Sequence, residues 1–127
     1  MKHSLNFICT GNKIDKRLSK IKYPDLLHYE IQFVIMIDSQ EYFCDNYFPF
    51  LEFLHEIKPW LNDEFDDFIF ECTDTEDNPL ISILKKDNMQ YKITSTWELF
   101  NNDVLFSKDT IKAEILNCIK KLGIFID

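Results

Sequence analysis

Glycine is almost absent from this chain, since only Gly11 and Gly123 occur among its 127 residues. A glycine-rich phosphate loop needs several closely spaced glycines, because only glycine lets the backbone approach the phosphates closely enough. The sequence therefore excludes nucleotide binding by such a loop. Long apolar runs are also missing. The longest, Phe33–Ile37, is far too short to cross a membrane, and the first residues lack the apolar run of a signal peptide.

Closely spaced cysteines are missing as well. Cys9, Cys44, Cys72 and Cys118 are far apart, and no two form a C-x-x-C pair. Structural zinc sites use ligands at close spacing, so we expect no metal, and no cofactor is indicated either. We expect four unpaired thiols in the reducing cytoplasm, where a free cysteine behaves as a small buried hydrophobic residue.

No residue pattern indicates a reaction. His3, His28 and His55 are far apart, and none stands in a known nucleophile motif. The segment Asp74–Asn78 has the alternating oxygen ligands of a calcium loop, but it lacks the central glycine and the closing glutamate. We therefore expect a protein that is not an enzyme.

The composition favours one folded domain. Hydrophobic residues make up 46% of the chain, and they include twelve phenylalanines, five tyrosines and two tryptophans. This content excludes disorder and is sufficient for one hydrophobic core, so we expect a single domain over residues 1–127.

The net charge of −8 is unevenly distributed. Residues 1–22 hold 6 of the 14 basic side chains and 1 of the 22 acidic ones, which leaves 8 basic and 21 acidic side chains for the rest. Such a body repels phosphate groups, so neither nucleic acid nor an anionic membrane is an expected partner. We expect the basic segment to fold back onto the acidic body.

Lysine and arginine are absent between Asp63 and Asp77, where eight side chains are acidic. The acidic residues are Asp63, Glu64, Asp66, Asp67, Glu71, Asp74, Glu76 and Asp77. Phe68 and Phe70 anchor this segment in the core as a strand, which places Glu71 on the exposed face. Like charges at this density repel one another, which indicates contact with a basic partner. The alternative is that the charge serves solubility only.

Trp97 is a second candidate contact residue. Its neighbours Thr96 and Glu98 are polar, and an aromatic residue in such surroundings can anchor an interface. It is equally suited to be the last core residue of its strand.

The apolar spacing predicts strands and helices. The expected strands are Leu5–Cys9, Leu26–Ile37, Glu41–Cys44, Phe65–Cys72, Leu80–Lys85, Met89–Trp97 and Val104–Phe106. A helix should follow Pro49 with Phe50, Phe53, Leu54 and Ile57 on its buried side, and Pro59 should kink or end it. Ser107 and Gly123 are suited to begin and end a second helix.

These elements predict an α+β domain. We expect an antiparallel sheet of about five to seven strands with two main helices packed on one face. The other face is then available to water or to a partner.

Three segments carry a resemblance to a known class of proteins. They read YFPFLEFLHEIKPWL at Tyr47–Leu61, FDDFIFE at Phe65–Glu71 and MQYKITSTWE at Met89–Glu98. The pattern resembles small bacterial immunity proteins of polymorphic-toxin and contact-dependent inhibition systems, over Ile31 to Glu98. The resemblance implies an acidic, cytoplasmic α+β inhibitor that binds one cognate toxin, often a basic nuclease. The resemblance lies in packing patterns, so it assigns no residue a function.

The residues themselves favour the same function. An acidic protein without catalytic residues can occlude a basic cleft, and opposite charges speed association. The alternative is a non-catalytic adaptor or regulatory binding module without a toxin partner. An enzyme with paired carboxylates is the third possibility. Asp66 and Asp67 point to opposite faces of a strand, so that pair is poorly placed to share a proton.

Overall fold

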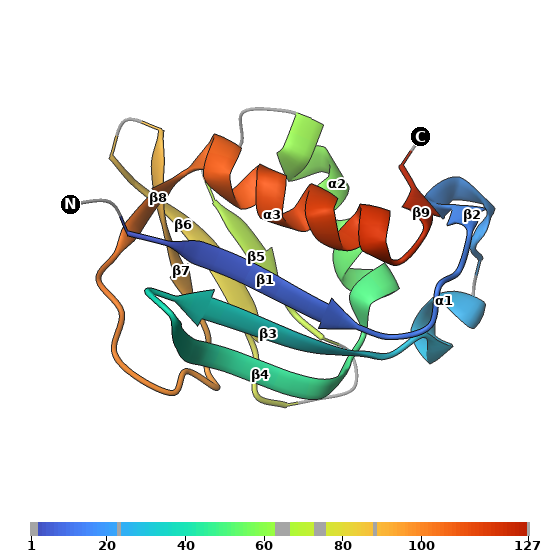
Figure 1. Cartoon of the computed structure of the whole chain (residues 1–127), viewed down its shortest axis with the longest axis horizontal. Helices are drawn as coiled ribbons and strands as arrows, with labels where there is room; N and C mark the ends of the chain where they lie inside the picture. Colours follow the sequence, from blue (N-terminus) through green and yellow to red (C-terminus); the bar gives the residue numbers. More distant parts are fainter. Residues whose placement is uncertain (1–2, 23, 63–66, 73–75, 88, 127) are drawn as a thin grey trace.

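The computed structural model describes residues 3–22, 24–62, 67–72, 76–87 and 89–126 (Figure 1). Its first antiparallel sheet has the order β1-β3-β4, with β1 (Leu5–Thr10), β3 (Ile31–Ile37) and β4 (Gln40–Phe48). The second has the order β5-β6-β7-β8, with β5 (Phe68–Phe70), β6 (Ile81–Asp87), β7 (Gln90–Thr94) and β8 (Leu105–Ser107). A short parallel pair joins β2 (Lys16–Arg17) to β9 (Ile124–Phe125).

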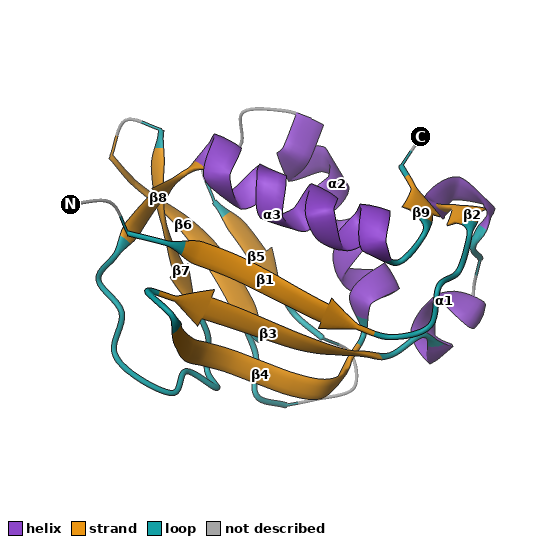
Figure 2. Cartoon of the chain, in the orientation of Figure 1, coloured by secondary structure: helices purple, strands orange, loops and turns teal. Residues whose placement is uncertain are grey.

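Within these ranges, two long helices and two short ones accompany the sheets (Figure 2). They are η1 (Leu18–Lys20), α1 (Asp25–His28), α2 (Phe50–Asn62) and α3 (Lys108–Lys121). The expected α+β class is confirmed, but the expectation of one sheet is wrong, because the described antiparallel strands are divided into sheets of three and four. Helix α2 follows β4 and packs against both sheets through Phe53. The antiparallel strands that follow α2 pair with one another and form the second sheet.

Helix α2 begins after Pro49, as the sequence predicts, and its stripe of Phe50, Phe53, Leu54 and Ile57 is buried. Pro59 was expected to kink or end the helix, and the expectation of an end is wrong, since the helix continues to Asn62. Proline removes one backbone hydrogen bond near the end of the helix. The next two residues, Trp60 and Leu61, are buried in the core, and their packing favours helical continuation.

The chain before β3 is less extended than expected. Residues Asp25–His28 form α1, and β3 begins only at Ile31. The alternation of polar and apolar residues here matched a strand, but Pro24 at the N-cap and Asp25 in the first turn favour a helical turn. The strands predicted after Pro49 are all present, although each is shifted or shortened by a few residues.

Helix α3 has the predicted ends. The Ser107 hydroxyl accepts a hydrogen bond from the Thr110 amide at 3.1 Å, which caps the first turn. Gly123 follows the helix with φ of 70°, in the left-handed region that favours glycine. Figure 1 shows α3 running along β1, where Glu114 Oε1 accepts a hydrogen bond of 3.0 Å from the Phe7 amide. The helix thus satisfies part of an otherwise open strand edge.

The basic N-terminal segment does fold back. Lys16 and Arg17 of β2 pair with β9, and the Ile14 amide donates to the Leu122 carbonyl at 2.9 Å. Among the described residues, no helix has the length and apolar character needed to span a membrane.

The prediction of four unpaired thiols is wrong for two of them. Cys9 and Cys118 form a disulfide with their Cα atoms 5.8 Å apart. The two cysteines are 109 residues apart in the sequence, and they meet because α3 packs against β1. Cys44 and Cys72 lie outside this bond. The expectation of a reducing compartment loses its support, because it depended on reduced thiols.

Candidate partner-binding surface

Strand β5 separates the acidic residues predicted to bind a partner. Asp67 precedes the strand, and its Oδ1 accepts a hydrogen bond of 2.8 Å from the Lys85 amide. Glu71, Glu76 and Asp77 follow the strand, and all three are exposed. The remaining predicted residues, Asp63, Glu64, Asp66 and Asp74, lie outside the described residues.

The expected alternation along β5 is confirmed. Phe68 and Phe70 are buried, whereas Ile69 is 51% exposed. Glu71 is exposed as predicted, but it lies just beyond the strand rather than in its middle. The described acidic side chains therefore gather at the ends of β5, and the exposed face between them carries an apolar residue.

The side chain of Asn78 makes two hydrogen bonds to the backbone of Cys72. Asn78 Oδ1 accepts a hydrogen bond of 2.8 Å from the Cys72 amide, and its Nδ2 donates to the Cys72 carbonyl at 3.0 Å. These bonds hold Asn78, the neighbour of Asp77, next to Cys72.

Asp77 and Trp97 are brought together although they are 20 residues apart. The indole Nε1 donates to Asp77 Oδ2 at 3.1 Å, and the Thr96 hydroxyl donates to the Asp77 carbonyl at 2.6 Å. The ring of Trp97 also stacks on Phe43 at 6.2 Å between centroids, with 13° between the planes. Trp97 is not the last core residue of its strand, because β7 ends at Thr94, although its ring does pack on the core residue Phe43. Its role as an interface anchor stays a prediction.

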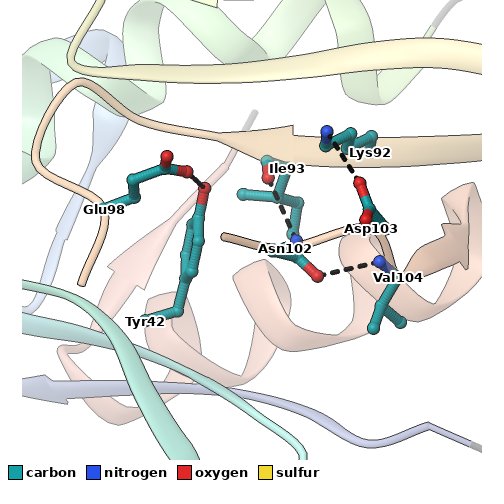
Figure 3. A network of polar contacts seen from close by, with 7 residues as sticks. All are labelled: Tyr42, Lys92, Ile93, Glu98, Asn102, Asp103 and Val104. Atoms are coloured by element: carbon teal, nitrogen blue, oxygen red, sulfur yellow. Dashed lines mark hydrogen bonds and ion pairs between the residues drawn. The ribbon is translucent and has the colours of Figure 1, made fainter. Parts of the chain in front are cut away.

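The segment that carries Trp97 is anchored to the first sheet (Figure 3). The Tyr42 hydroxyl donates to Glu98 Oε2 at 2.9 Å, and the Leu99 amide donates to the Tyr42 carbonyl at 2.9 Å. Burial, followed by the adjacent Glu98 carboxylate, raises the pKa of Tyr42, so its hydroxyl stays a neutral donor at physiological pH.

The same segment is anchored to the second sheet by Asn102, which is buried (Figure 3). Its Nδ2 donates to the Ile93 carbonyl at 3.2 Å, and its Oδ1 accepts from the Val104 amide at 2.9 Å. The following residue, Asp103, also contacts the second sheet, since its Oδ1 lies 3.4 Å from Nζ of Lys92 in β7. Trp97 is thus presented on a loop with fixed ends rather than on a long free segment.

A surface cavity of about 240 Å³ lies beside Trp97, and we name it the Trp97 pocket. Its lining includes Glu30, Asp45, Tyr47, Cys72, Leu80 and Trp97. Asp45 and Tyr47 belong to β4 of the first sheet, whereas Cys72 and Leu80 lie just outside β5 and β6 of the second. The sequence interpretation missed Glu30, Asp45 and Tyr47 as site residues. The available signal was Tyr47, a large aromatic residue directly after Asp45 and Asn46.

A separate pair of titratable groups lies at the N-terminal end of the described chain. His3 Nδ1 lies 2.7 Å from Asp38 Oδ2, and this pair ties the N-terminal residues to the β3–β4 turn. The Ser4 amide and then His3 lower the pKa of Asp38. Among the described residues, no group of three or more histidine, cysteine or acidic side chains is arranged to hold a metal ion. The absence of catalytic activity stays a prediction.

The fold and the surface define a small α+β protein with an acidic pocket walled partly by aromatic side chains. Residues 4–127 match the family described as a domain of unknown function, DUF7878, and the chain belongs to that family. Comparisons with curated proteins and with solved structures found no match.

Proposed function

We propose that this chain is an immunity protein that binds a cognate bacterial toxin and neutralises it by occluding a basic surface. The partner would contact the surface formed by Glu71, Glu76, Asp77 and Trp97 together with the Trp97 pocket. The observation that carries the proposal is the Asp77–Trp97 hydrogen bond of 3.1 Å, which joins the acidic connection to a fixed aromatic side chain.

Charge and rigidity both support binding here. None of the described residues that line the Trp97 pocket is basic, and two of them, Glu30 and Asp45, are acidic. Exposed acidic side chains attract a basic partner electrostatically, which raises the association rate constant. A tryptophan held in one orientation loses little conformational entropy on binding, which is a property of interface hot spots.

The cellular location is part of the proposal. The resemblance to immunity proteins implies the cytoplasm, whereas a disulfide is more typical of oxidising compartments. Alkylation of cell extracts under denaturing conditions distinguishes an oxidising from a reducing compartment. Only Cys44 and Cys72 react while the Cys9–Cys118 bond is intact, whereas all four cysteines react when it is reduced.

The proposal requires that a gene next to the one for this chain encodes a toxin domain, and we expect the chain to restore growth of cells that express that domain. The double variant Glu76→Gln/Asp77→Asn should protect less well, because it removes two exposed charges while the new asparagine side chain retains an oxygen acceptor for Trp97. The matched control Glu41→Gln/Glu56→Gln removes the same charge from exposed positions elsewhere and should protect fully. Growth curves at graded toxin induction provide the measurement.

Two results would count against the proposal. Failure of the parent chain to protect, although it binds the neighbouring product, would favour the adaptor function over immunity. Equal protection by the two double variants would place the interface away from Asp77 and Trp97.

A further inference from the structure

The Trp97 pocket combines carboxylates, aromatic rings and a small volume, and we propose that it receives the side chain of one arginine from the partner. This inference rests on the proposed function and names the chemical group that the surface recognises. The argument depends on three features of the pocket, namely its charge, its aromatic walls and its size.

The charge of the pocket selects a cation. Glu30 lies directly before β3 and is exposed, and Asp45 is half-buried on β4. Asp45 Oδ1 accepts a hydrogen bond of 2.9 Å from the Tyr47 amide, which fixes the carboxylate beside the pocket. The two carboxylates share a cavity whose described lining contains no basic residue, so a positively charged group is favoured and an anion is repelled.

The aromatic walls suit a cation that can also stack. Tyr47 is 72% exposed, which is unusual for a ring of this size. One face of the Trp97 ring lies against Phe43, and Trp97 also lines the pocket. The Asp77 carboxylate bonded to the indole adds negative charge next to this ring. Cations are attracted to the faces of such rings, and tryptophan binds them best.

The geometry favours arginine over lysine or a free small molecule. A guanidinium group is planar, stacks on aromatic rings and donates paired hydrogen bonds to carboxylates, whereas an ammonium group is a compact and strongly hydrated charge. The cavity of about 240 Å³ is smaller than the roughly 300–1,000 Å³ of most small-molecule sites. It therefore suits one side chain that a larger partner inserts.

Titration with N-acetyl-arginine amide, followed by NMR, tests this inference without the partner. We expect the indole N–H signal of Trp97 to shift and saturate at millimolar concentrations. The signal of Trp60, which is 2% exposed and packs edge-to-face with Tyr91 in the core, should not move and serves as an internal reference. N-acetyl-citrulline amide has the same length without the charge and should bind at least about tenfold more weakly, because it lacks charge-assisted hydrogen bonds.

Two variants test whether arginine binds in the Trp97 pocket. Asp45→Asn should weaken arginine binding about tenfold, since it keeps an oxygen for the Tyr47 amide but removes the charge. Asp67→Asn removes the same charge at the other end of β5 and should leave binding unchanged. Equal binding of citrulline and arginine, or equal weakening by the two variants, would overturn the inference. The growth assay is independent of this titration, so protection without arginine binding would leave the proposed function intact and refute only the pocket.

Discussion

Replacing Phe53 by alanine is expected to lower the free energy of unfolding by about 3–5 kcal/mol, which is the range for removing a large aromatic side chain from a core. Phe53 is 1% exposed, and its ring centroid lies 5.4 Å from those of Phe48 and Phe70. Phe33 and Phe68 lie at 6.2 and 5.8 Å. The side chain therefore contacts both sheets, and its loss leaves a cavity where they meet.

Urea denaturation followed by circular dichroism measures this effect. Phe53→Leu retains most of the apolar volume and should cost clearly less than Phe53→Ala. Glu56→Ala lies on the exposed side of the same helix and should change the stability by no more than about 0.5 kcal/mol. A Phe53→Ala protein as stable as the parent would show that α2 is not the element that joins the two sheets.

Removing the Cys9–Cys118 disulfide is expected to lower the free energy of unfolding by a similar amount. The bond closes a loop with a sequence separation of 109, and the chain-entropy relation gives a loss of about 4–5 kcal/mol for a loop of this length. Both cysteines are at most 2% exposed, so serine at these positions also introduces buried hydroxyl groups. Cys9→Ser/Cys118→Ser should therefore unfold at much lower urea concentration than the parent.

Treatment with a reductant distinguishes the loss of the disulfide from the effect of the serine substitutions. Dithiothreitol should destabilise the parent protein and have no effect on the double variant. Cys44→Ser leaves the disulfide intact and should respond to reductant as the parent does. A parent protein with four alkylatable cysteines before reduction would contradict the disulfide itself.

The sequence predicts α2 and α3 well, because their signals are local. The stripe from Phe50 to Ile57 and the cap at Ser107 need only the spacing of neighbouring residues. The helix end expected at Pro59 was wrong because proline destabilises an isolated helix, whereas the burial of Trp60 that favours continuation is a tertiary effect. The division into two sheets and the Cys9–Cys118 bond were missed for the same reason, since both depend on contacts between distant segments.

The candidate surface was predicted only in part. The acidic segment and Trp97 stand out in the sequence, and the structure places Asp77 against Trp97. Asp67 was grouped with them because it is close in sequence, but it lies at the opposite end of β5. Glu30 and Tyr47 come from separate segments and meet only because β3 pairs with β4, so no local pattern indicated that they share a pocket.

The salt dependence of association tests most directly whether the Asp77–Trp97 surface binds a basic partner. The association rate constant of the parent chain with the toxin that it protects against in the growth assay should fall steeply as ionic strength rises. The variant Glu71→Gln/Glu76→Gln/Asp77→Asn should associate more slowly at low salt and show a flatter dependence. Identical rates and identical slopes for the parent and this variant would contradict an acidic interface at this surface.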